Sequence, residues 1–305
     1  ADNRVARGSE LEASLDAAGR VQLVEARGDA KAPARFSFGA DRSLTSDRIW
    51  STADGKIETQ SASVLTSGPS EIRGRQFFIQ NGDVVEFRTT SRATLTSETR
   101  TVSADTTTAK IDSRTNQLAE LRQTGHVDFK DGDRTGRADS ALTRNDGSSV
   151  TLDGKAMLRD ARTQVDADHI ELDDSTKKQT ASGKVTTLMF DSAEPVKVVS
   201  DIVESSGSDH IVFMQDMGNP RSQRVQLWRG SLNILANLVE GSSDNKSLVA
   251  SGNVQSNFGL VRATADRLDY DDAKQTAHYT GHVRARKQET TIDAADVVEI
   301  GRAHV

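Results

Sequence analysis

Carboxylate and imidazole side chains are the groups of this sequence that could do chemistry. Asp173-Asp174 and Asp271-Asp272 are adjacent pairs, which is the arrangement expected for acid–base catalysis or for binding a metal ion. Both pairs occupy the same position in a repeated segment, so they recur along the chain and do not converge on one site. We therefore interpret them as polar residues of solvated turns.

Two further acidic groups suggest calcium binding. Asp131 and Asp133 flank a glycine, and Asp201 and Asp216 form a more distant pair. Neither group has the spacing of a calcium-binding loop, in which alternate residues over twelve positions supply the oxygens. We expect no calcium site at these residues.

The histidines give a weak metal signal. His126 and His282 each follow a repeated glycine, so a paired site is conceivable if the copies share a face. His278 and His282 have HxxxH spacing, but on a strand four residues span roughly 13 Å, too far for one metal ion. No HExxH, GxSxG, glycine-rich phosphate loop or cysteine is present. The sequence therefore predicts a protein that is not an enzyme and has no cofactor.

The composition indicates a thin interior. Of the 305 residues, 35% are hydrophobic, 4% are aromatic and 28% are charged, and the apolar residues recur along the whole chain. This is typical of an elongated solenoid. The formal net charge is -6 without a cluster of basic and aromatic residues, which argues against nucleic acid as a partner. No apolar run reaches the roughly 18 to 20 residues that span a bilayer.

A repeat organises the chain. The segments ADHIELDDSTKKQTASGKV (167–185) and ADRLDYDDAKQTAHYTGHV (265–283) have similar sequences and share Ala-Asp, Asp-Asp and Gly-x-Val at the same positions. The pair Ala-Asp or Ala-Asn begins at residues 138, 167, 236, 265 and 295, and in the first four copies a glycine follows sixteen residues after the alanine. Three pairs of successive repeat glycines, 125/154, 154/183 and 252/281, are 29 residues apart. A fixed period of this length predicts an array of supersecondary units.

Each unit of the array has the pattern of two strands joined by turns. Residues 168–172 and 266–270 alternate apolar and polar side chains, as a strand with one buried face does. A second strand then runs through the repeat glycine, where we expect a bulge or bend. Residues 232–239 have a helical period but overlap a repeat start, so we interpret them as strand. Residues 186–230 are expected to carry irregular insertions.

The pattern A[DN]x[ILV]x[YLI]-D-turn-x-G-x-V, clearest at 167–185 and 265–283, resembles the OstA-like proteins, the periplasmic bridge components of lipopolysaccharide export of the LptA and LptC type. The segment 225–230 also resembles their strand pattern. The resemblance implies an all-β, twisted antiparallel jelly-roll, or β-taco, with an open hydrophobic groove. It also implies that the groove holds lipopolysaccharide acyl chains, that edge strands stack on other jelly-rolls between complexes at the two membranes, and that the protein works in the periplasm without catalysis.

Alternation along the strands points one row of apolar side chains inward. As plain core these residues need no ligand, and the residues alone favour that interpretation; with the resemblance they become candidates for a lipid groove. The candidates are Val127, Phe129, Leu152, Ile170, Leu172, Val185, Val254, Leu268, Tyr270 and Val283.

The expected organisation is one continuous solenoid. Residues 1–99 carry degenerate repeats, and residues 100–300 carry clear OstA-like repeats. Residues 301–305 are expected to be non-native, because together with Ile300 they can be back-translated into a common sequencing-adaptor sequence. The resemblance leaves an LptA-type, LptC-type or fused role open. Two other classes also stay open: a β-helix enzyme acting on polysaccharides and a structural repeat or adhesin. An apolar trough open to solvent would favour the lipid carrier over both.

Overall fold

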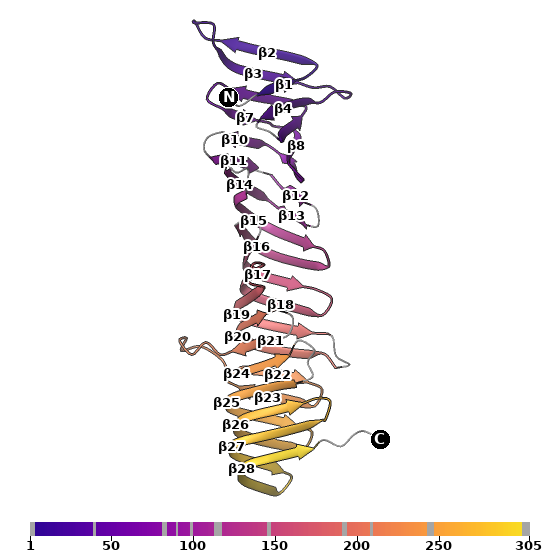
Figure 1. Cartoon of the computed structure of the whole chain (residues 1–305), viewed down its shortest axis with the longest axis vertical. Helices are drawn as coiled ribbons and strands as arrows, with labels where there is room; N and C mark the ends of the chain where they lie inside the picture. The colour runs from indigo at the N-terminus through magenta and orange to yellow at the C-terminus, as the bar shows by residue number, and fades with distance from the viewer. Residues whose placement is uncertain are drawn as a thin grey trace. The chain divides into compact units, whose positions relative to one another are not determined.

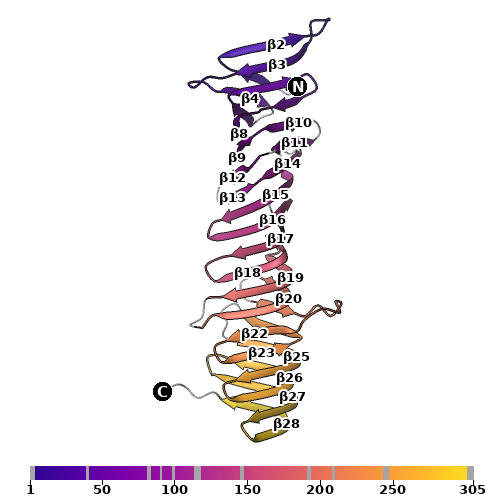
Figure 2. The ribbon, with the colours of Figure 1, turned by 180° about the vertical axis from the view of Figure 1, so that it is seen from behind.

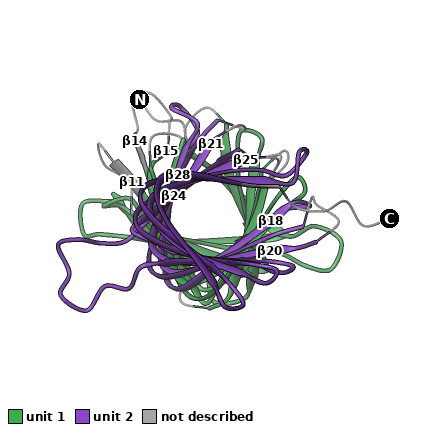
Figure 3. Ribbon diagram, turned by 90° about the horizontal axis from the view of Figure 1, so that it is seen from below, with its two compact units in different colours: residues 1–152 green, residues 153–305 purple. Residues whose placement is uncertain are grey.

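The computed structural model describes residues 4–38, 41–80, 84–89, 91–97, 100–112, 118–144, 148–190, 194–207, 210–242 and 247–300. Within these ranges the chain forms strands and connecting turns, without a helix that could cross a membrane. The tail predicted at 301–305 lies outside them. The chain divides into two compact units, residues 1–152 and 153–305, which Figure 3 colours separately.

The first unit consists of short strands followed by two long ones. Its strands are β1 (Val5–Arg7), β2 (Glu10–Leu15), β3 (Val21–Arg27), β4 (Ala34–Phe38), β5 (Arg42–Ser46), β6 (Arg48–Thr52), β7 (Lys56–Glu58), β8 (Ala62–Ser67), β9 (Ser70–Arg75), β10 (Phe77–Gln80), β11 (Val84–Thr89), β12 (Ala93–Ser97), β13 (Arg100–Ala104), β14 (Thr106–Asp112), β15 (Leu118–Asp131) and β16 (Arg134–Arg144). The boundary between the units falls inside β17 (Ser149–Arg159).

The second unit consists mainly of long strands that follow one another in chain order (Figures 1 and 2). Its strands are β18 (Thr163–Asp173), β19 (Lys178–Met189), β20 (Val196–Ser206), β21 (His210–Met214), β22 (Val225–Arg229), β23 (Leu232–Ala236), β24 (Leu238–Ser242), β25 (Ser247–Phe258), β26 (Val261–Asp271), β27 (Thr276–Lys287) and β28 (Thr290–Ile300). The expected strand structure at 232–239 is confirmed, as the two strands β23 and β24 on either side of Asn237.

The long strands pair antiparallel with a break in register at their middle. Between β26 and β27 the pairing passes from Thr264↔Arg284 to Arg267↔Thr280, so the repeat glycine of β27 and the two residues after it are left out of the ladder. The same break recurs between β18 and β19, between β19 and β20, and between β25 and β26. The bulge predicted at the repeat glycine is confirmed, and it bends each long strand into two halves.

In the first unit the same bend divides one long strand into two short strands. β13 and β14 flank Asp105, and they pair with opposite ends of β15: Val102 with Phe129, and Thr107 with Gln123. The two halves therefore lie in two facing columns of strands, which we call walls.

The irregular region is narrower than the sequence indicates. β21 pairs with residues 202–206 of β20 and β22 pairs with residues 196–199, so β21 and β22 are the two halves of one repeat strand. Residues 215–224 are a loop inserted at the bend. The insertion lengthens the sequence spacing between glycines, so the repeat is hard to recognise in the sequence. The strands on either side of the insertion still pair as in a regular repeat.

Alternate side chains of both walls point inward and form the core. In the first unit the core includes Phe36, Phe38, Leu44, Ile57 and Phe87, each at most 4% exposed. The rings of Phe38 and Phe87 are 6.3 Å apart at their centroids. Burying side chains of this size stabilises the fold by about 1.5–3 kcal/mol each relative to exposure.

Candidate functional site

Two continuous rows of inward side chains run across the second unit, one on each wall. The Ile170 row is connected from strand to strand by directly paired residues; its members are Ile170, Ala181, Val203, Phe213, Val239, Ala250, Leu268, Tyr279 and Val297. The Val165 row is connected in the same way; its members are Val165, Thr187, Val198, Leu227, Ile234, Ser256, Ala263, Ala285 and Ile292. Neither row contains a charged residue.

The two rows face each other closely. The hydroxyls of Ser256 and Tyr279, one from each row, are 2.8 Å apart and form a buried hydrogen bond. A cavity of about 20 Å³ lies between the walls, lined by residues such as Met189, Phe213 and Leu227. That volume holds about one water molecule. The walls are therefore packed against each other in this structure.

All ten residues predicted for the lipid groove point inward. Their side chains are buried, from 0% exposed at Ile170, Val185 and Leu268 to 8% at Leu172. Burial raises the pKa of Tyr270 to about 12, with a smaller effect of the nearby Asp272 carboxylate. In this conformation the rows are closed core and do not line a trough open to water.

The repeat glycine and the repeat aspartate are in contact across neighbouring strands. A Cβ on Gly125 would lie 2.5 Å from Oδ2 of Asp105, and a Cβ on Gly183 would lie 2.8 Å from Cβ of Asp168. Asn237 takes the place of the aspartate opposite Gly252. These glycines also have φ of 75° to 79°, a conformation that favours glycine. The Ala-Asp and Gly-x-Val parts of the repeat are therefore two sides of one contact.

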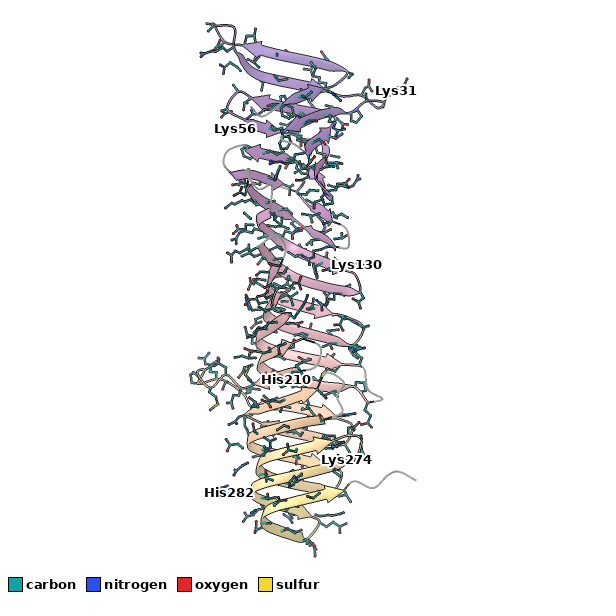
Figure 4. All side chains as sticks on the ribbon, in the orientation of Figure 1. Lys31, Lys56, Lys130, His210, Lys274 and His282 are labelled. Carbon is teal, nitrogen blue, oxygen red and sulfur yellow. The ribbon has the colours of Figure 1, made fainter. Side chains whose placement is uncertain are left out.

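The histidines beside the repeat glycines bind these aspartates. Nδ1 of His126 is 2.7 Å from Oδ2 of Asp105, and Nδ1 of His282 is 2.7 Å from Oδ2 of Asp266. The hydrogen bond to Asp105 raises the pKa of His126. His282 is exposed and lies on the outside of the strands (Figure 4). The structure does not bring these histidines into one site, because each pairs with its own carboxylate in a different unit.

The other polar candidates also have structural partners. Oδ1 of Asp173 accepts hydrogen bonds from the backbone N–H groups of Ser175 and Thr176, and the hydrogen bond from the Ser175 hydroxyl lowers its pKa. Asp271 accepts from the N–H of Lys274 at 3.1 Å. Asp173 and Asp271 are the last residues of β18 and β26, and Asp174 and Asp272 lie in the turns that follow, so the pairs occur at turns as predicted. His278 binds Asp296, on the neighbouring strand, at 2.8 Å.

Asp201 performs a task that the sequence did not reveal. It occupies the repeat-aspartate position, but its strand faces the inserted loop and not a glycine. Its Oδ2 accepts the backbone N–H groups of Asp216 and Gln223, at 3.0 and 3.2 Å, from the two ends of that loop. Asp201 therefore contacts Asp216 through the Asp216 backbone N–H, and its carboxylate holds the two ends of the loop together. Among the described residues, no group of three or more acidic or histidine side chains is arranged to hold a metal ion.

Comparisons with known proteins confirm the resemblance. Residues 90–178 and 262–303 match the family described as LptA/(LptD N-terminal domain) LPS transport protein, so these two segments are similar to that family. Both matched segments contain the Ala-Asp and glycine positions described above. No curated protein matches the sequence.

One similar solved structure is LptH, the LptA homologous periplasmic component of the lipopolysaccharide transport device from Pseudomonas aeruginosa. It shares 10% identity and a TM-score of 0.34, over 39% of this chain and 82% of that one. The assignment of this chain to an all-β antiparallel jelly-roll rests on its own strands and on the family match.

Proposed function

We propose that this chain is a non-enzymatic periplasmic carrier that binds lipopolysaccharide by its acyl chains and passes it toward the outer membrane as part of a protein bridge. The observation that supports this most is the pair of uncharged rows, which continue in register across nine strands of the second unit. An acyl chain is held by buried area, at about 0.8 kcal/mol per CH2, and a path of this kind needs no specific polar group.

Lipid entry on this proposal requires the two walls to move apart. In the closed structure Ile170, Val198 and Leu268 are fully buried, so the contacts between the rows must be exchanged for contacts with lipid. The exchange is nearly neutral in apolar burial, because each row stays covered by hydrocarbon. The bulges are suited to such a movement, since the repeat glycine and the residue after it are left out of the ladder at each bend.

The edges of the two units are suited to strand addition. β28 pairs with β27, its second side is free of any described strand, and Ile292 and Val298 on it are 49% and 58% exposed. β2 pairs with β3 alone among the described strands, with Leu11 and Leu15 54% and 59% exposed. Exposed edge strands with apolar side chains are templates for pairing. We propose that other jelly-roll proteins of the bridge bind there.

Site-specific photo-crosslinking tests the lipid path. A benzophenone amino acid replaces Phe129 or Tyr270, which are inward aromatic residues 7% and 5% exposed. The matched controls place it at Lys130 and Asp269, the neighbouring positions that face the other side of the same strands. Lys130 is labelled on the outer surface in Figure 4. Purified variants are illuminated with lipopolysaccharide and the adducts are counted.

Adducts at Phe129 and Tyr270 without adducts at Lys130 and Asp269 are the expected result. If a folded, β-rich chain gives none at the inward sites, the rows are permanent core. That outcome would favour a structural repeat, the class with which the closed packing of the two walls is also compatible.

A further inference from the structure

One inward row of the first unit is interrupted by polar side chains. The row runs through directly paired residues Phe77, Thr89, Thr107, Gln123 and Ala141. Thr89 and Thr107 are each 3% exposed and Gln123 is 1% exposed. Three neighbouring members of an interior row are thus polar and cut off from water.

The repeat shows that these residues are unusual at their positions. Gln123 lies two residues before the repeat glycine, and the other four copies place Leu152, Ala181, Ala250 and Tyr279 there. Thr107 lies three residues after Ala104 of an earlier Ala-Asp pair, and the copies that begin at 138, 167, 236 and 265 place Ala141, Ile170, Val239 and Leu268 at this position. Every residue in both sets is at most 5% exposed, so both positions point inward in these four copies. The fold itself accepts an apolar residue at either place.

Thr107 and Gln123 each have one buried polar atom that the described residues do not satisfy. Thr89 Oγ1 accepts the backbone N–H of Thr107 at 3.2 Å. Thr107 Oγ1 and Gln123 Nε2 are buried and have no hydrogen-bond partner among the residues that the structure describes. By contrast, the hydroxyl of Tyr279, at the Gln123 position of another copy, binds Ser256. Leaving a buried donor unpaired is unfavourable, so such groups usually serve a ligand or water.

The surroundings define what kind of group fits. The inward neighbours on the same strands are Phe87, Ala109, Leu121 and Val127, all at most 3% exposed. The row contains no cation that would neutralise a phosphate or a carboxylate. An amide N–H and a hydroxyl set between hydrocarbon side chains suit a neutral acceptor that itself carries hydrocarbon.

We propose that Thr107 and Gln123 bind the carbonyl of the ester or amide link that joins an acyl chain to the rest of the lipid. The inference rests on the proposed lipid path and adds a fixed point to it. On most of the path the acyl chain contacts apolar side chains only, whereas at this row its carbonyl accepts hydrogen bonds from two donors. The site therefore distinguishes acyl chains from plain alkyl chains.

Binding of two lipids that differ only in the carbonyl tests the site. The probes are lysophosphatidylcholines with a sixteen-carbon chain attached through an ester or through an ether, titrated against the full chain. Even one of the two hydrogen bonds predicts roughly fivefold tighter binding of the ester form, so at least this difference is expected. The isosteric substitutions Gln123→Met and Thr107→Val are expected to remove this preference without weakening the ether form. Tyr279→Phe is the matched control and is expected to keep it.

Thermal unfolding without lipid gives a second measurement. Gln123→Met is expected to unfold at the same or a higher temperature than the parent chain, because the substitution removes an unpaired buried amide. A lower temperature together with an unchanged ester preference would overturn the site and assign the amide to internal packing. Equal binding of both lipids by the parent chain would also overturn it, while leaving the lipid path intact. If neither these lipids nor lipopolysaccharide bind, both the carbonyl site and the proposed lipid-carrier function are wrong.

Discussion

Asp168 and Gly183 touch across neighbouring strands so closely that a Cβ on the glycine would lie 2.8 Å from the Cβ of the aspartate. The same contact joins Asp105 to Gly125 and Asp266 to Gly281. It explains why the chain repeats Ala-Asp and Gly-x-Val together: the aspartate covers the bend of the next strand, and the bend has room for a hydrogen atom only.

Substituting the repeat glycine should therefore lower the free energy of unfolding by more than the strain of its backbone conformation alone. Gly183→Ala adds a Cβ at φ of +77° and against Asp168, so we expect it to lower the free energy of unfolding by about 2–4 kcal/mol. Gly259→Ala is the control, because Gly259 has φ of +58° with open space around it; about 1–2 kcal/mol is expected there. Urea unfolding of both variants measures the difference. Equal losses would mean that the contact with Asp168 is unimportant.

Acid should weaken the first unit through Glu25. Hydrogen bonds from Arg48 and then Arg27 lower the pKa of Glu25 to about 2, from an ordinary value of 4.5. A lowered pKa means that the folded state holds its proton less tightly than the unfolded state, so the stabilisation is complete above pH 4.5 and is lost as pH falls from 4.5 toward 2. Glu25→Gln is expected to flatten this part of the curve of stability against pH. Parallel curves for the two chains would contradict the assignment.

His126 should titrate at a higher pH than an ordinary histidine. Its hydrogen bond to Asp105 raises its pKa above 6.5, so the contribution of His126 is complete below pH 6.5 and is lost as pH rises through the folded value. Asp105→Asn is expected to return the pKa toward 6.5 while keeping the packing, since Asn237 occupies the equivalent place opposite Gly252. NMR titration of the imidazole protons measures the shift. An unchanged pKa in this variant would place the cause elsewhere.

The inserted loop should be dispensable for the fold. Phe213 and Val225, on either side of it, are 1% and 0% exposed and match the inward Ala181 and Val185 of a regular repeat. Replacing residues 215–224 by Gly-Lys recreates the sequence of that regular bend. We expect an unchanged circular dichroism spectrum and a melting temperature within a few degrees of the parent. Replacement by Ala-Ala, which disfavours positive φ, should melt lower than replacement by Gly-Lys. A Gly-Lys variant that melts far below the parent chain would show that the loop is structural.

Strand addition at β28 should depend on its exposed apolar side chains. Ile292, the last member of the Val165 row, is 49% exposed. Ile292→Lys is expected to weaken binding of a jelly-roll partner at least tenfold, because an inward charge on an edge strand opposes pairing. Glu289→Lys, in the preceding turn, introduces the same side chain beside the strand and controls for charge. Binding measured by biolayer interferometry separates the two; equal weakening would assign the effect to charge alone.

Much of this architecture can be predicted from the sequence, because the alternation and spacing that specify each repeat lie within a short stretch of the chain. Alternation assigns residues such as Ile170 and Leu268 to the inner face, since successive side chains of a strand point to opposite sides. The spacing of Ala-Asp and glycine gives the hairpin length and the place of the bulge. The turn function of Asp173 follows from its position between two strands.

Other features were decided only by the tertiary structure. The role of Asp201 and the regular pairing of β21 and β22 depend on contacts across a ten-residue insertion, which periodicity cannot follow. The burial of Gln123 is set by its register with Thr107 on β14. The sequence by itself determined the repeat, the bend and the inward face, because these follow from the geometry of one strand. How closely the two walls pack, and which polar groups they enclose, depends on side chains from strands far apart in the chain, and only the folded protein fixes those contacts.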